Sequence, residues 1–116
     1  MKPDLKKTTI LVNRNGMGIA NQALRQLLIG KYFSLMLESN QLPAVICFYA
    51  EGVHLAVTGS PVLEQLKELQ NRGVHLILCS TCVDFYNIND QVEVGIVGGM
   101  TDILEAQIRA DKVVTL

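Results

Sequence analysis

The sequence predicts a single α/β domain of three layers, α/β/α, with helices on both faces of a mostly parallel sheet of about five strands. Its apolar runs are continuous instead of alternating with polar residues, which is typical of strands buried on both faces. Helical patterns separate these runs along the chain. The length of 116 residues fits one domain with a core of its own.

The first half of the chain is expected to hold two strands and two helices. Residues 1–7 are expected to form a flexible N-terminus, so that the domain spans residues 8–116. We expect Ser60 to cap the second helix, Pro61 to occupy its first position and Gly73 to end it. The other expected elements are a strand at 8–13, a glycine loop at 15–18, a helix at 19–39, a strand at 44–49 and a helical turn at 51–57.

The second half predicts three more strands and one more long helix. The apolar run at 74–78 is the third strand, and a short helix or turn is expected at 83–86. Residues 92–95 are the candidate for the fourth strand. Thr101 and Asp102 are expected to cap a helix that ends near residue 110, and the last strand follows at 112–116.

The helix at 19–39 carries two apolar stripes. The stripe suited to the sheet consists of Leu24, Leu28 and Leu35. The other consists of Ile29, Phe33 and Leu37. The two are rotated by roughly 140° about the helix axis. Because a surface helix of a monomer usually has one apolar face, the second stripe indicates a partner subunit or a neighbouring helix of the same chain.

The composition excludes several classes of function. Ten basic residues against eleven acidic ones give a net charge of −1, without the basic face that nucleic-acid binding needs. No apolar run approaches the roughly 18 residues of a membrane span. The N-terminal residues lack the apolar stretch of a secretory signal. Three cysteines, an odd number, favour reduced thiols in the cytoplasm over a disulfide framework.

The motif Cys79-Ser80-Thr81-Cys82 directly follows the third predicted strand. Ligands and chemistry collect at such strand ends in parallel α/β folds. If a helix begins at Val83, Cys82 lies at its N-terminus and is favoured as the reactive thiolate. Cys79, the last residue of the strand, faces the same loop. The open alternatives are half of a metal site or two small buried residues.

Other chemistries fit the sequence less well. A thioredoxin-like protein has its C-x-x-C after the first main strand, whereas here it follows the third. One C-x-x-C supplies only two zinc ligands, and neither His54 nor His75 has the spacing of a local ligand pair, so no metal site is predicted. Cys47 is expected in the core, because it lies in the middle of a strand.

Five residues outside the motif are candidates for supporting roles. His54 is a candidate base near the thiols, because an imidazole side chain ordinarily changes its charge near neutral pH. Asp84 is close to Cys82 in sequence and is a candidate to tune it. Asn15, Gly16 and Gly18 form a loop whose backbone N–H groups could face an anion, although the loop lacks a nucleotide fingerprint. Capping, packing and turn formation are the structural alternatives for these residues.

The run Cys79-Ser80-Thr81-Cys82-Val83-Asp84 resembles the C-x-T-C-x-D signature of the DsrE/DsrF-like family, which has the YchN-type fold. Within that family, the segments 48–53 and 59–63 look most similar to the C-terminal domain of YedF, a sulfurtransferase-like selenium metabolism protein. The resemblance runs from about Thr8 to the end of the chain. Where the family often has Gly, eight positions after the first cysteine, this chain has Asn87, which tolerates the same left-handed backbone.

The resemblance implies a fold, an activity and an assembly. Members such as DsrE and TusD relay sulfane sulfur as a cysteine persulfide between small carrier proteins, and their active cysteine matches Cys79. Such domains form dimers, trimers or hexamers. The resemblance therefore implies an oligomeric, cytoplasmic carrier of sulfur or selenium that needs no bound cofactor. The alternatives are a non-catalytic binding or assembly module with inert thiols, and a dithiol redox protein with a reversible Cys79–Cys82 disulfide.

Overall fold

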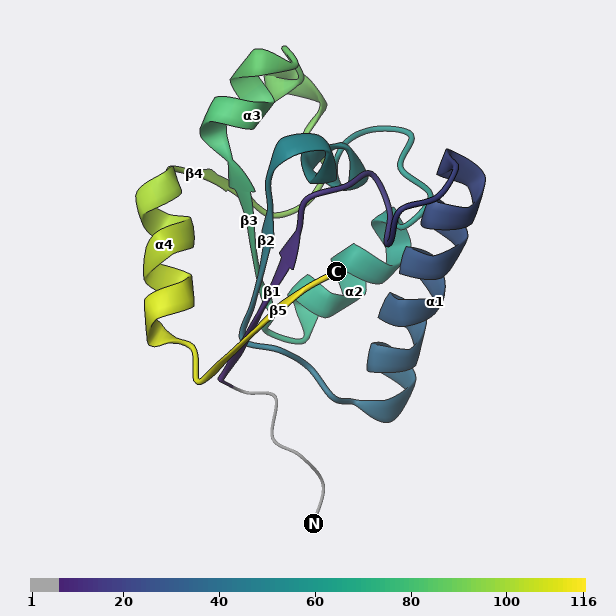
Figure 1. Cartoon of the computed structure of the whole chain (residues 1–116), viewed down its shortest axis with the longest axis vertical. Helices are drawn as coiled ribbons and strands as arrows, with labels where there is room; N and C mark the ends of the chain where they lie inside the picture. The colour runs from purple at the N-terminus through teal and green to yellow at the C-terminus, as the bar shows by residue number, and fades with distance from the viewer. Residues whose placement is uncertain (1–6) are drawn as a thin grey trace.

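Five continuous apolar segments of the chain form one sheet in which all neighbouring strands are parallel (Figure 1). The structure is a computed structural model, and it describes residues 7–116. The strand order is β4-β3-β2-β1-β5. The strands are β1 (Thr8–Val12), β2 (Val45–Phe48), β3 (His75–Cys79), β4 (Ile96–Gly98) and β5 (Lys112–Thr115).

Helices cover both faces of this sheet, which confirms the predicted three-layer α/β domain (Figure 1). Helices α1 and α2 lie on one side of the sheet and α4 lies on the other, while α3 lies beyond the end of β3. The helices are α1 (Gln22–Ser39), α2 (Leu63–Asn71), α3 (Ser80–Phe85) and α4 (Met100–Arg109), with two short 3₁₀ helices, η1 (Ala50–Ala56) and η2 (Asn89–Gln91).

The core consists of two clusters of unequal size, one on each face of the sheet. Successive residues of a strand point to opposite faces, so Ile10 and Val12 join the large cluster while Leu11 joins the small one. The large cluster also receives side chains from α1 and α2, among them Phe33 and Leu66. The small cluster consists of Leu11, Cys47, Cys79 and Ile103 of α4. Two of the three thiols of the chain are therefore buried on the α4 face.

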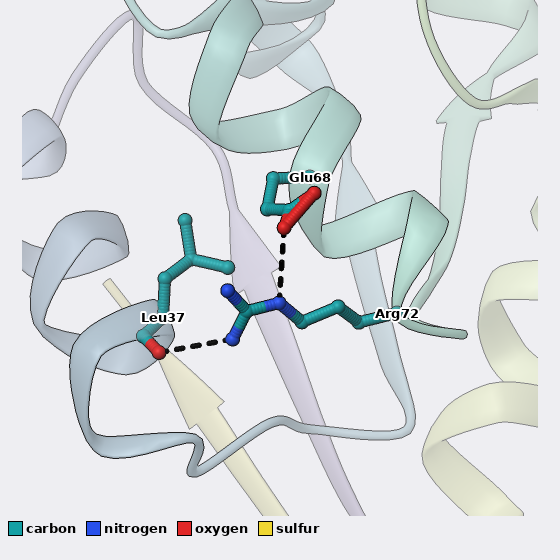
Figure 2. A network of polar contacts seen from close by, with 3 residues as sticks. All are labelled: Leu37, Glu68 and Arg72. Carbon is teal, nitrogen blue, oxygen red and sulfur yellow. Dashed lines mark hydrogen bonds and ion pairs between the residues drawn. The ribbon is translucent and has the colours of Figure 1, made fainter.

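Arg72, at the end of α2, forms a hydrogen bond with the last turn of α1 (Figure 2). Its Nη1 donates a hydrogen bond of 3.0 Å to the Leu37 carbonyl in the last turn of α1. Its Nε lies 3.2 Å from a carboxylate oxygen of Glu68, one turn earlier on α2. The Glu68 pair is half exposed, and an exposed ion pair contributes at most about 1 kcal/mol. The Leu37 carbonyl also accepts a hydrogen bond from the N–H of Asn40, the C-cap residue of α1, so Arg72 adds a second donor at the end of this helix.

The two apolar stripes of α1 have the opposite roles to those predicted. Ile29 and Phe33 are buried against the sheet and Leu37 packs beside them, whereas the stripe assigned to the sheet is exposed. The exposed fractions are 44% for Leu24, 38% for Leu28 and 62% for Leu35. Both stripes are apolar, so the pattern alone could not fix the rotation of the helix. An uncovered apolar face is nevertheless present on α1.

The fourth strand lies later in the chain than predicted. Residues 92–95 do not form it, and β4 begins at Ile96. Val92 makes an isolated antiparallel bridge with Val57, and Val94 is buried. Gly95 has a left-handed φ of 80°, and a Cβ there would lie 2.9 Å from the Leu76 carbonyl oxygen. This segment is therefore a partly buried connection that packs against β3 through Val94 and Gly95.

Several element boundaries also differ from the predictions. Helix α2 begins at Leu63 with Val62 as its N-cap, and the Ser60 hydroxyl instead accepts a hydrogen bond from the Val62 N–H in the preceding turn.

Helix α1 begins after Asn21, whose side chain accepts a hydrogen bond from the Leu24 N–H. Asp102 acts in the cap of α4, as predicted, by accepting from the Gly99 N–H, whereas Thr101 lies inside the helix and Gly99 is its N-cap. The predicted flexible segment lies outside the described residues except for Lys7.

Candidate functional site

The two cysteines of the motif lie at the junction between β3 and α3. Cys79 is the last residue of β3 and the N-cap of α3, because its Sγ accepts a hydrogen bond of 3.4 Å from the Cys82 N–H. The helix therefore begins at Ser80 and not at Val83 as predicted. Cys82 lies in its first turn, one helical turn after Cys79, so both side chains face the same side of the junction.

The two sulfur atoms are in direct contact. The Cys82 thiol donates a hydrogen bond to Cys79 Sγ, and the two sulfurs are 3.0 Å apart. Both cysteines are free thiols, as is Cys47. Cys79 has no exposed surface, whereas Cys82 is half buried. Cys82 is therefore the sulfur that solvent can reach, and Cys79 lies beneath it.

The backbone of Ala50 supplies a third contact to this pair. Its N–H lies at the start of η1 and donates a hydrogen bond of 3.1 Å to Cys82 Sγ. Ala50 has a left-handed φ of 50°, which is uncommon for a residue with a side chain. Such strain is found preferentially at functional sites. Nothing in the sequence around Ala50 indicated this role, because backbone direction depends on the packing of η1.

Packing against the end of β1 fixes the position of η1. A Cβ on Gly52 would lie 2.1 Å from the Val12 carbonyl oxygen, so only glycine allows this approach. Tyr49 precedes Ala50 and packs against the small cluster that contains Cys79. Its hydroxyl accepts a hydrogen bond of 3.3 Å from the Asn13 side chain, at the end of β1. Contacts with the ends of β1 and β2 thus hold the Ala50 N–H against Cys82.

The surroundings of Cys82 raise its pKa, which contradicts the prediction of a favoured thiolate. Burial is the largest cause, followed by the hydrogen bond to Cys79. The Ala50 N–H opposes them and lowers the pKa. Burial also raises the pKa of Cys47 to about 11, in keeping with its predicted place in the core. At neutral pH the free Cys82 is therefore a protonated thiol. The hydrogen bond from the Ala50 N–H favours its ionised form.

The structure gives His54 and Asp84 contacts away from the sulfurs. The ring of His54 packs against the ring of Tyr86, with centroids 4.5 Å apart, and lines a groove together with Asn15. Neither cysteine lines this groove. The exposed Asp84 carboxylate accepts a hydrogen bond of 2.7 Å from the Asn89 side chain, which stabilises the turn after α3.

The glycine loop and the turn at Asn87 have structural explanations. Gly16 approaches Arg25 so closely that a Cβ would lie 2.4 Å from the Cβ of Arg25. Gly18 has a left-handed φ of 86°, and α1 begins several residues later with its own cap. Asn87 has a left-handed φ of 56°, which confirms the conformation expected where the family often has Gly.

Two further features bear on the class of protein. Within residues 7–116, no group of three or more His, Cys, Asp or Glu side chains is placed to hold a metal ion. No helix in that range is both long enough and apolar enough to cross a membrane. Together with the fold, the paired thiols define a parallel α/β domain with a dithiol at the carboxyl end of a strand.

The chain belongs to the DsrE/DsrF-like family, whose sequence profile matches residues 6–116. Among solved structures it is similar to the YchN protein from E. coli, at 22% identity and a TM-score of 0.67, covering 96% of this chain and 99% of that one. It is also similar to MTH1491 from Methanobacterium thermoautotrophicum, a protein of unknown function, at 18% identity and a TM-score of 0.68 over 96% and 99% of the two chains. A conserved protein of unknown function from Bacteroides thetaiotaomicron, BT1422, matches at 13% identity with a TM-score of 0.63 over 95% of each chain. No curated protein matches the chain significantly.

Proposed function

We propose that this domain is a sulfurtransferase-like carrier that accepts sulfane sulfur, or selenium, as a persulfide on its Cys79–Cys82 pair. The observation that carries the proposal is the position of two free thiols in contact at a strand end, with a backbone donor on the accessible one. Membership of the DsrE/DsrF-like family supports a sulfur-relay role. The chemistry needs no resident cofactor, because both sulfur atoms come from the chain and from the donor.

The exposure of the two sulfurs suggests that Cys82 is the one that is loaded. The family resemblance points to Cys79, but Cys79 has no exposed surface. In the proposed step, the Cys82 thiolate attacks the outer sulfur of a donor persulfide. A Cys82 persulfide forms and the donor leaves as a thiolate, so no oxidant is needed. The Ala50 N–H would stabilise the negative charge on Cys82 Sγ during this attack.

The donor and the acceptor are taken to be carrier proteins with reactive thiols. An acceptor thiolate would attack the outer sulfur of the Cys82 persulfide and regenerate the free pair. A reducing compartment such as the cytoplasm suits this exchange, because the three thiols are free.

We also propose that the domain assembles into a homo-oligomer. The exposed apolar stripe of α1 includes Leu35, and a second exposed apolar surface lies around α4 on the opposite face of the sheet. Exposed apolar residues that gather on one helix face are typical of protein interfaces. The second surface consists of Met100, Leu104 and Ile108 on α4, with Ile96 and Val113 on the edge strands β4 and β5.

Intact-protein mass spectrometry after incubation with glutathione persulfide tests the carrier function. We expect the wild type to accept sulfur from the donor at its Cys79–Cys82 pair. Cys79→Ser should gain one sulfur atom on Cys82. Cys82→Ser should not be loaded, and Cys47→Ser is the matched control because Cys47 is a buried thiol outside the pair. The proposal is wrong if no variant gains sulfur at Cys79 or Cys82 under conditions that load an established persulfide carrier.

A dithiol redox protein is the second candidate, and the 3.0 Å separation of the two sulfurs favours it. Such a protein would form a reversible Cys79–Cys82 disulfide with a measurable potential, without any sulfur donor. A binding module with inert thiols would instead leave both cysteines unreactive toward alkylating reagents. Labelling rates on the native protein separate this last alternative from the other two.

A further inference from the structure

The contact between the two sulfurs has a consequence once Cys82 carries a sulfane sulfur. A disulfide has a sulfur–sulfur length of about 2.05 Å, so the pair must close by only about 1 Å from its separation of 3.0 Å. The Cys79 sulfur already lies against Cys82 Sγ, which would be the inner sulfur of the persulfide. The hydrogen bond from the Cys82 N–H to Cys79 Sγ holds this arrangement from the backbone side.

We propose, building on the carrier function, that the domain discharges its sulfur as hydrosulfide through attack of Cys79 on the persulfidated Cys82. A new bond forms between Cys79 Sγ and Cys82 Sγ, and the bond between Cys82 Sγ and the outer sulfur breaks. The persulfide reacts in its ionised form, so the electron pair of that bond leaves with the outer sulfur, which takes the Cys79 proton and departs as HS⁻. The outer sulfur is reduced, and the two cysteine sulfurs are oxidised to a disulfide.

The burial of the two residues gives this attack its direction. A nucleophile attacks a sulfur–sulfur bond at one sulfur, and the leaving sulfur departs on the far side. Cys79 is fully buried beneath Cys82, and Cys82 is the half-exposed member of the pair. Attack from Cys79 therefore drives the leaving sulfur outward, toward solvent or toward an acceptor seated there. With selenium in place of the outer sulfur, the same step would release hydroselenide.

The product state requires a reductant before another cycle. The Cys79–Cys82 disulfide has no thiol left to be loaded, and an exchange with Cys47, which lies in the same buried cluster as Cys79, would only move the disulfide within the chain. A small thiol or a dithiol protein would have to reduce the pair. Each turnover would then consume two electrons, unlike a simple persulfide relay.

Sulfide release under anaerobic conditions tests the discharge. The wild type and Cys79→Ser are loaded with glutathione persulfide and freed of excess donor, and released sulfide is then trapped with monobromobimane. We expect the wild type to release one sulfide per chain and to contain a Cys79–Cys82 disulfide by peptide mapping. Cys79→Ser should keep its extra sulfur on Cys82 and release at least tenfold less sulfide.

The outcomes separate this inference from the carrier function on which it builds. If the wild type is loaded and retains its persulfide as long as Cys79→Ser does, the discharge is wrong and the carrier function stands. If neither protein is loaded, the carrier function itself fails. Peptide mapping of the wild type decides the matter even if Cys79→Ser does not fold. A sample without donor must yield neither sulfide nor disulfide, since either product would indicate a different oxidant.

Discussion

At the scale of single residues, the chemistry of the site depends on a balance of opposing effects on Cys82. Burial and the Cys79 thiol raise the pKa of Cys82, whereas the N–H of Ala50 lowers it. Neither effect could be predicted from the motif alone. The effect that raises the pKa depends on how deeply the end of β3 is buried. The effect that lowers it depends on Ala50, a left-handed residue 32 positions earlier in the chain.

The alkylation rate of Cys82 should therefore depend on pH, and Cys79 should influence the pH range over which this rate rises. Since its pKa is raised, a smaller fraction of Cys82 is thiolate at neutral pH than in an unstructured peptide, and its reaction with iodoacetamide should be slower. The rate should rise about tenfold per pH unit until the pH reaches the pKa. Replacing Cys79 by Ala removes two of the raising contributions, so it should shift the rate profile of Cys82 to lower pH.

The matched control for this measurement is Cys47→Ala, which removes a buried thiol outside the pair and should leave the profile of Cys82 unchanged. Peptide mapping identifies the alkylated residue in each case. An unchanged profile in Cys79→Ala would contradict the electrostatic coupling of the two thiols.

At the scale of elements, the short helix η1 positions the site through its contact with the end of β1. The place of this element was predicted well, as a helical turn at 51–57, because it follows a continuous apolar strand. Its role was not predicted, because the contact of Gly52 with the Val12 carbonyl joins segments 40 residues apart. Sequence patterns report local periodicity and carry little information on such approaches.

The substitution Gly52→Ala should destabilise the protein strongly. The added Cβ would lie 2.1 Å from the Val12 carbonyl oxygen, so η1 or β1 must shift. We expect a loss of more than about 2 kcal/mol in the free energy of unfolding, measured by urea denaturation. In variants that remain folded, η1 should move away from α3 and the reaction of Cys82 with iodoacetamide should change.

Gly30→Ala is the control, because a Cβ at Gly30 in α1 meets its nearest neighbour at an ordinary 3.8 Å. That change should stabilise the protein by up to about 1 kcal/mol through helix propensity. Equal effects of the two substitutions would contradict the close approach of η1 to β1.

At the scale of the whole molecule, the parallel α/β architecture followed from the sequence because continuous apolar runs and intervening helices leave few alternatives. The C-x-x-C motif lies at the end of the third strand, as the sequence indicated. The rotation of α1 about its axis could not be predicted, because that helix carries two apolar stripes on different sides. One stripe consists of leucines, and the other contains Ile29 and Phe33. Which stripe meets the sheet is decided by its fit against α2 and the strands, and only the assembled core contains that information.

The exposed stripe of α1 should be part of a subunit interface. Leu35 is 62% exposed, so a charge there would be solvated in a monomer and buried in an assembly. We expect the wild type to form an oligomer in size-exclusion chromatography with light scattering. Leu35→Glu should shift it toward the monomer without loss of helical signal in circular dichroism.

Lys67→Glu places the same side chain at an exposed position of α2 and should leave the assembly unchanged. A wild type that is monomeric at high concentration would exclude the homo-oligomer. If Leu35→Glu left an oligomeric wild type intact, the interface would have to lie elsewhere, with the surface around α4 as the next candidate.

The hydrogen bond from the Ala50 amide to Cys82 also places a natural spectroscopic probe beside the sulfur. The resonance frequency of an amide proton responds to the charge and the size of the atom that accepts its hydrogen bond. A thiol, a persulfide and a disulfide at Cys82 should therefore give Ala50 three distinct signals in a nitrogen-15 correlation spectrum. Because this reporter is part of the backbone, the chemistry at the pair can be followed in real time in the unmodified protein.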